Sequence, residues 1–296
     1  MNLLHQIFDF SDYGALLALV RNALIAGAVL GVVGGLISIF VMARDLPFAV
    51  HGISELSFAG ASAALLLGVN VVAGSIVGSL IAAAAIGALG VRARDRNSVI
   101  GVLMPFGLGL GVLCLALYHG RAANKFGILT GQIVAVDAPQ MSWLIGTSVI
   151  VLLALAVMWR PLMFASLDPD VAAARGVPVG ALSAVFMVVL GLAVALSVQI
   201  VGALLVLTLV CVPAAAAMRV TASPRLLPLL SVAFGVVSMV GGTLLALGST
   251  VPISPYVTTI SFLIYLGCRA AGAVRLRRGW SRRPVAAGPA RAYSTP

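Results

Sequence analysis

The chain has 296 residues, of which 61% are hydrophobic and 9% are charged, and its formal net charge is +10. A soluble domain cannot bury that much apolar surface, because part of its surface must face water. The composition therefore excludes a soluble globular protein and predicts a polytopic membrane protein. Apolar runs of about 20 residues without the alternation of β-strands favour helices over a transmembrane barrel, so the expected fold class is all-α.

The positive charge is spread over short loops and the C-terminal tail, and arginine carries it everywhere except at Lys125. This distribution follows the positive-inside rule and indicates the anionic inner leaflet as the partner of these side chains, rather than nucleic acid. The rule places the N-terminus outside and the C-terminus in the cytoplasm, with only Arg21, Arg121 and Lys125 outside. The arginines expected inside are Arg44, Arg92, Arg94, Arg96, Arg160, Arg175, Arg219, Arg225 and those from Arg269 to Arg291.

Hydropathy predicts a transmembrane domain, 13–272, between a polar N-terminal segment, 1–12, and a basic tail, 273–296, expected to be disordered. The block 179–220 would extend roughly 60 Å as one helix, about twice the hydrocarbon thickness, so it should contain two spans and a turn near 197–202. This gives nine spans, or eight if one segment is re-entrant. The other expected spans are 13–42, 47–68, 71–91, 99–118, 141–159, 226–247 and 255–268, with a short interfacial helix in the link 119–140.

In the first span, Gly27, Gly31 and Gly35 recur every four residues and therefore share one helix face. This spacing predicts close contact with another helix. The second span holds His51 and Glu55, the only glutamate of the chain. Residues i and i+4 share a helix face, so an imidazole and a carboxylate at this spacing can hold one divalent metal ion. Alternatively, the two side chains hydrogen-bond each other or a helix end near the cytoplasmic surface.

The link 160–178 contains the pattern of a short capped helix. Asp168 can cap it, Pro169 suits its first position, and Asp170 places negative charge in its first turn. Gly176, followed by a proline, should end it. Further on, Pro213 should kink a span of small residues, which indicates either a hinge near the pore or ordinary packing.

Three stretches in order resemble the permease subunits of the ABC-3 family of metal-uptake transporters: ARDLPFAVHGISELSFAGASAALLLGVN, SLDPDVAAARGVPV and IVGALLVLTLVCVPAAAAMRVT. The resemblance implies a permease homodimer that binds an ATP-binding ABC subunit and receives Zn, Mn or Fe ions from an extracytoplasmic metal-binding protein. It further implies a coupling helix at 166–179, with Asp168, Pro169, Asp170, Ala172 and Gly176 facing the ATPase. Such a permease carries out no chemistry and holds no permanent cofactor, and it resides in the bacterial plasma membrane.

The first stretch departs from the common family pattern, since many members carry an Asp where this chain has His51 and a His where it has Glu55. The exchange keeps one nitrogen and one carboxylate ligand, which still suits Zn, Fe or Mn. An ATPase-independent secondary metal transporter or channel is the alternative, but it should carry more ionisable residues or inverted repeats. An intramembrane metalloenzyme would need an H-E-x-x-H motif, and the sequence lacks both this motif and a P-loop.

Overall fold

The computed structural model describes residues 21–89, 93–120, 138–247 and 253–280, and all regular structure in these ranges is helical. Eight of the helices are long and apolar enough to cross a membrane, and α11 is a shorter apolar helix. The all-α fold class is therefore confirmed. The helices are α3 (Arg21–Ala43), α4 (Pro47–Leu67), α5 (Val71–Leu89), α6 (Ala93–Leu117), α8 (Ala138–Leu167), α9 (Pro169–Ala174), α10 (Val179–Val201), α11 (Ala203–Val220), α12 (Leu226–Leu247) and α13 (Ile253–Trp280).

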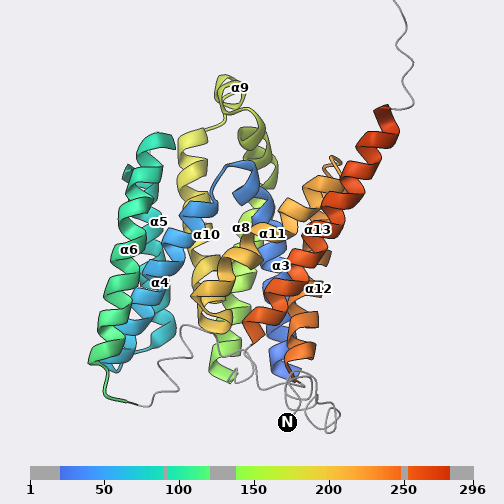
Figure 1. Ribbon diagram of the computed structural model, residues 1–296. Coiled ribbons are helices and arrows are strands. Elements are labelled where there is room, and N and C mark those ends of the chain that lie inside the picture. Colours follow the sequence, from blue (N-terminus) through green and yellow to red (C-terminus); the bar gives the residue numbers. More distant parts are fainter. Residues whose placement is uncertain (1–20, 90–92, 121–137, 248–252, 281–296) are drawn as a thin grey trace, which may run out of the picture.

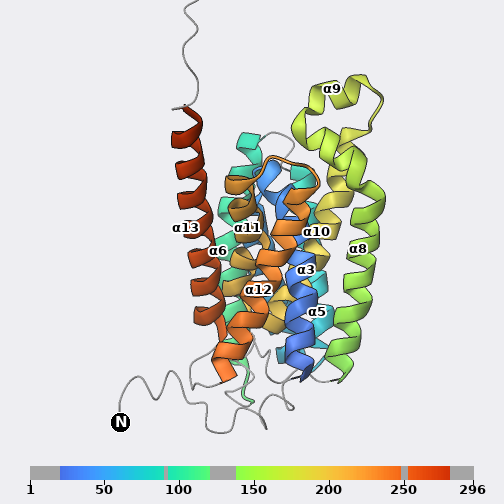
Figure 2. The same cartoon turned by 90° about the vertical axis from the view of Figure 1, so that its right-hand side faces the viewer.

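The long helices run alternately up and down in one bundle (Figure 1). The helices α4, α5 and α6 form one side, α12 and α13 form the other, and α3, α10 and α11 lie between them. The short helix α9 projects from one end of the bundle, and α13 ends on the same side (Figure 2). The described arginines that follow or end α3, α9, α11 and α13 adjoin this end, whereas Arg21 begins α3 at the other end. This distribution supports the predicted orientation, which remains a prediction.

Each expected span corresponds to a helix, and the expected turn lies at Gly202 between α10 and α11. Gly202 has a φ of 81°, which favours glycine, and its N–H donates to Val198 O. Three helices are longer than expected, and one of them, α6, begins at Ala93 instead of residue 99. Helix α8 continues through Pro161 to Leu167, because a proline inside a membrane helix removes one backbone bond without ending the helix.

Helix α13 continues to Trp280, so the beginning of the expected disordered tail is helical instead. Residues 269–278 include three alanines and four arginines, which favour helix. Arg275 also donates to Val220 O at the end of α11, at 2.9 Å. The N-terminal segment 1–12, the rest of the tail and most of the link expected to hold an interfacial helix lie outside the described residues.

The predicted glycine face of α3 packs directly on α12. A Cβ atom at Gly31 would lie 2.7 Å from Val236 Cα, and one at Gly35 would lie 2.8 Å from Ser231 O. These glycines let the two backbones meet, as expected from their spacing.

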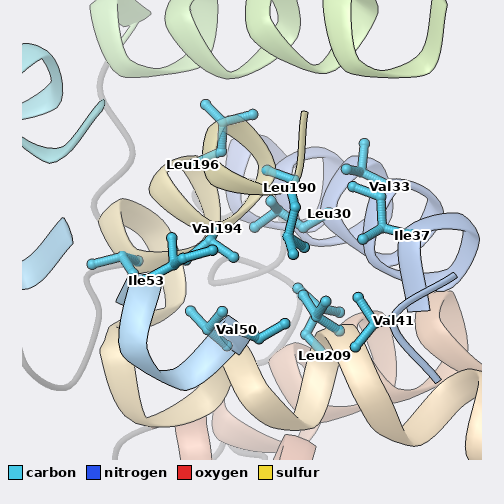
Figure 3. Close-up of a cluster of buried hydrophobic side chains, with 14 of the residues drawn as sticks. Leu30, Val33, Ile37, Val41, Val50, Ile53, Leu190, Val194, Leu196 and Leu209 are labelled. Atoms are coloured by element: carbon cyan, nitrogen blue, oxygen red, sulfur yellow. The ribbon is translucent and has the colours of Figure 1, made fainter. Parts of the chain in front are cut away.

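Helix α4 packs on α5, α6, α10 and α11, and most of its residues are buried. Its residues Val50 and Ile53 pack with buried side chains of α3, α10 and α11, including Leu30, Val194 and Leu209 (Figure 3). Farther along the helix, Gly60 of α4 meets the backbone of α5 at Gly74. Packing on several sides fixes the rotation of α4 about its axis, and therefore the direction of its polar side chains.

Candidate metal site

The first turns of α4 place His51 and Glu55 on one helix face. Pro47 begins the helix, at the end of the bundle where α9 lies. His51 Nε2 and Glu55 Oε1 are 3.7 Å apart, and the side chains are 32% and 8% exposed. The predicted i, i+4 pair therefore exists. It lies near one end of its span, as hydropathy suggested.

The two side chains do not hydrogen-bond each other, because 3.7 Å is too long for such a bond. Within the described residues, His51 Nδ1 and Glu55 Oε2 are also buried without a hydrogen-bond partner. Leaving a buried polar atom unpaired costs about 1–3 kcal/mol, so such atoms require an explanation. The alternative of a simple hydrogen-bonded pair does not describe this geometry.

The spacing of the pair is compatible with two ligands of one metal ion. Nitrogen and oxygen ligands each lie about 2.0–2.2 Å from zinc, so two ligands of one ion are roughly 3–4 Å apart. Phe48 lies on the same side of α4 and is 67% exposed, so the helix face becomes less accessible from Phe48 through His51 to Glu55. His51 is therefore the more accessible member of the pair.

The described residues contain no group of three or more His, Cys, Asp or Glu side chains that could hold a metal ion. A closed structural site normally has four protein ligands. The pair alone would bind an ion weakly and leave it free to dissociate.

The predicted short helix is present as α9. The Asp168 side chain accepts a hydrogen bond from Val171 N at 3.0 Å, and Pro169 occupies the first position of the helix. Ala172 is fully buried and anchors α9 on the ends of α8 and α10, while Asp170 is exposed. Gly176 follows the helix with a φ of 84°, which explains the glycine. The result is a short capped helix at the end of the bundle where α4 begins, the same end as the His51–Glu55 pair (Figure 1).

Pro213 lies inside α11, next to a cluster of polar atoms that the sequence did not predict. Ser38 Oγ of α3 accepts from Ala214 N at 3.2 Å and lies 3.0 Å from Ser231 Oγ of α12. Both hydroxyls are within hydrogen-bond distance of Gly35 O, at 2.8 and 2.6 Å. We call Ser38, Ser231 and their backbone partners the serine cluster. It ties α3, α11 and α12 together beside the proline.

Pro213 also leaves one backbone carbonyl without its helical hydrogen bond, because proline has no N–H to donate to the residue four positions earlier. That residue is Leu209, and a Cβ atom at Gly34 would lie 3.0 Å from Leu209 O. Gly34 therefore lets α3 approach α11 at its weakened turn. No sequence spacing links these residues, which come from separate helices.

The ABC-3 transport family model matches residues 17–271, which is most of the chain. The chain belongs to the ABC-3 transport family. This ABC-3 chain is therefore a permease component of an ABC transporter, and a multi-pass protein of the bacterial membrane, as its motifs predicted.

Named relatives of this ABC-3 chain are import proteins for manganese or zinc. It is 30% identical over 83% of its length to the manganese import system permease protein ScaB of Streptococcus gordonii, covering 88% of that protein. It is 29% identical over 75% of its length to the manganese transport system membrane protein MntC of Halalkalibacterium halodurans, covering 76% of that protein. It is 25% identical over 82% of its length to the high-affinity zinc uptake system membrane protein ZnuB of Haemophilus influenzae, covering 94% of that protein.

A solved structure, PsaBC from Streptococcus pneumoniae in complex with Fab, has the same fold. The TM-score is 0.79 at 25% identity, and the match covers 90% of this chain and 99% of that chain. The ABC-3 fold of the described residues is thus a known transporter fold.

Proposed function

We propose that this chain imports a divalent transition-metal ion, Zn, Mn or Fe, and that the ion passes between His51 and Glu55. The observation that carries the proposal is that His51 Nδ1 and Glu55 Oε2 are buried without a hydrogen-bond partner, while His51 Nε2 and Glu55 Oε1 lie 3.7 Å apart. The manganese and zinc relatives support the class of cargo. An imidazole and a carboxylate suit these borderline metals.

We further propose that water or a second copy of the chain completes the coordination of the ion. The pair supplies too few ligands for tight binding, and a transport site must release its ion. A homodimer would bring two such pairs together. The exchanged order of His51 and Glu55 relative to the common family pattern keeps one ligand of each kind in every copy.

We also propose that a separate ATP-binding subunit drives transport by pushing on α9. The support is the rigid construction of this helix: a cap at Asp168, Pro169 at the start, Asp170 in the first turn and Gly176 at the end. Buried Ala172 would transmit the push to α8 and α10. An extracytoplasmic metal-binding protein would deliver ions at the opposite end. Pro213, beside the serine cluster, would act as the hinge of α11.

The test uses the complete transporter in proteoliposomes, with its ATPase and metal-binding protein, and radioactive isotopes of Zn, Mn and Fe. The double variant His51→Ala, Glu55→Gln should lose at least about tenfold in uptake, because each change removes a metal ligand. His119→Ala is the matched control, since His119 is an exposed histidine that follows the C-terminal end of α6 and does not belong to α4. Uptake at the wild-type rate in the double variant would remove the pair from the path, and uptake without ATP would reject the ABC mechanism.

A further inference from the structure

Helix α4 carries a third buried polar atom without a partner. Within the described residues, Ser62 Oγ joins His51 Nδ1 and Glu55 Oε2 in having no hydrogen-bond partner, and Ser62 is fully buried. Buried serines in membrane helices ordinarily donate to a carbonyl of the preceding turn. Ser197 does so with Ala193 O, and Ser38 does so with Gly35 O. The Ser62 hydroxyl, like that of Ser148 in α8, is therefore an exception.

The three unpaired atoms belong to one face of the helix. At 3.6 residues per turn, Ser62 lies about two turns beyond Glu55 and about three turns beyond His51, so all three side chains point in nearly the same direction. We call His51, Glu55 and Ser62 the α4 stripe. Ser62 lies roughly 10 Å from Glu55 along the helix axis, which is too far for both to bind one ion directly.

The other buried serines near the pair in α4 have partners. Ser54 Oγ donates to His51 O at 2.8 Å, and Ser57 Oγ lies 2.7 Å from Ser75 Oγ of α5. These two serines point away from the α4 stripe, by about 60° and 120° around the helix from His51. Hydroxyls that join helices are thus paired, and the unpaired hydroxyl lies on the face that holds the metal-ligand pair.

Exposure falls along the α4 stripe, from 32% at His51 to 8% at Glu55 and 0% at Ser62. The stripe is accessible from the end of the bundle where α9 lies and closed toward the opposite end. Ser62 is the member of the stripe nearest to that opposite end, where α4 ends and α5 begins. The fully buried Phe58 lies between Glu55 and Ser62 on the same face of α4, so a cation entering from that end would meet Ser62 first and would reach Glu55 only if the Phe58 ring moved.

We propose that Ser62 is a second step of the cation path, at which its hydroxyl oxygen contacts the hydrated divalent ion or one of its waters before the ion reaches Glu55 and His51. This proposal rests on the metal-import function proposed above. A neutral hydroxyl is a weak oxygen ligand, suited to an ion that keeps part of its water shell. The ion or its water would also provide the partner that the hydroxyl otherwise lacks. Because Ser62 is buried here, the step requires the outward end of the path to open.

The test compares Ser62→Ala, Ser62→Cys and Ser148→Ala with the wild type in the complete reconstituted transporter. Ser148 of α8 is the matched control, because its hydroxyl is equally buried and unpaired but does not belong to α4. Mn²⁺ and Zn²⁺ uptake at subsaturating concentrations is measured beside thermal stability. Removing an unpaired hydroxyl should leave stability unchanged or raise it.

Ser62→Ala should lower Mn²⁺ and Zn²⁺ uptake by about threefold to tenfold at unchanged stability, while Ser148→Ala keeps the wild-type rate. Ser62→Cys should raise the ratio of Zn²⁺ to Mn²⁺ uptake by at least roughly threefold, because a sulfur ligand favours zinc. A purely structural role would not change this ratio.

The outcomes separate the two proposals. Wild-type uptake in Ser62→Ala and an unchanged metal ratio in Ser62→Cys would overturn the role of Ser62, while the His51, Glu55 double variant still tests the main path. Loss of stability together with uptake in Ser62→Ala would equally overturn it, since the hydroxyl would then be structural. Wild-type uptake in the double variant would overturn the metal path as a whole.

Discussion

Two buried polar groups of this bundle differ in how their atoms are satisfied. In the serine cluster, Ser38 and Ser231 contact each other and the backbone of α3 and α11 at 2.6 to 3.2 Å. In the α4 stripe, each of the three side chains has a buried atom without a partner in the described residues. The difference suggests that paired hydroxyls hold helices together, and that the unpaired atoms of the α4 stripe are kept for the transported ion.

The contrast has an energetic basis. Each paired hydroxyl contributes on the order of 1 kcal/mol, whereas each unpaired buried atom costs about 1–3 kcal/mol. Proteins keep such local costs mainly at functional sites. Variants of the serine cluster should therefore affect stability first, and variants of the α4 stripe should affect uptake first.

The largest effect on stability is expected at Gly35, beside the serine cluster, where α3 and α12 are in close contact. Gly35→Val should destabilise the bundle by about 3 kcal/mol or more, because a Cβ atom would meet Ser231 O and Val232 Cα, both at 2.8 Å, and backbone atoms cannot rotate away. The measurement is thermal unfolding of the purified protein. Gly146→Val in α8 is the control, since nothing lies within 4 Å of a Cβ atom there. Equal stability of the two variants would contradict the close packing of α3 on α12.

A smaller effect is expected from removing one hydroxyl of the serine cluster. Ser38→Ala should lower stability by about 1–2 kcal/mol, because Ser231 loses one partner and Ala214 N loses the oxygen beside Pro213. Ser197→Ala is the control, since its hydroxyl bonds only within its own helix. Thermal unfolding and uptake per folded transporter are measured together. A stable Ser38→Ala variant with strongly reduced uptake would abolish the contrast with the α4 stripe.

The sequence predicted the helices well because hydropathy and local backbone rules decide them. The turn at Gly202 follows from the length of the apolar block, and the cap at Asp168 needs only residues within the next turn. The face of Gly31 and Gly35 follows from their spacing. The pairing of His51 with Glu55 likewise follows from one helical turn.

Other features depend on which helices meet, and local sequence does not contain this information. Ser38 and Ser231 are far apart in the chain and touch only because α3 packs on α12. The unpaired state of Ser62 depends on every helix around α4, so no motif marks it. Helix α8 also continues past Pro161, and α13 continues to Trp280, beyond the ends of their apolar runs. Hydropathy predicts the apolar part of a helix, and it does not predict where the helix itself ends.

The smallest effect is expected outside the membrane, at α9. Asp168→Ala removes the cap, worth on the order of 1 kcal/mol, and should raise the ATP consumed per imported ion by about twofold because α9 loses rigidity. Asp168→Ser retains a capping oxygen without the charge and should restore coupling. ATP hydrolysis and uptake are measured in the same proteoliposomes. If serine fails to restore coupling, the charge of Asp168 is what matters and the rigidity argument is wrong.

Glu55 is the only glutamate of the chain, and the described membrane spans contain no aspartate. If Glu55 is ionised, two copies facing each other in the homodimer proposed above would present two negative charges. A divalent ion between them would form a neutral complex, whereas a monovalent or trivalent ion would leave a net charge in a medium of low dielectric constant. Charge balance would then select the valence of the cargo before any ligand distinguishes one metal from another.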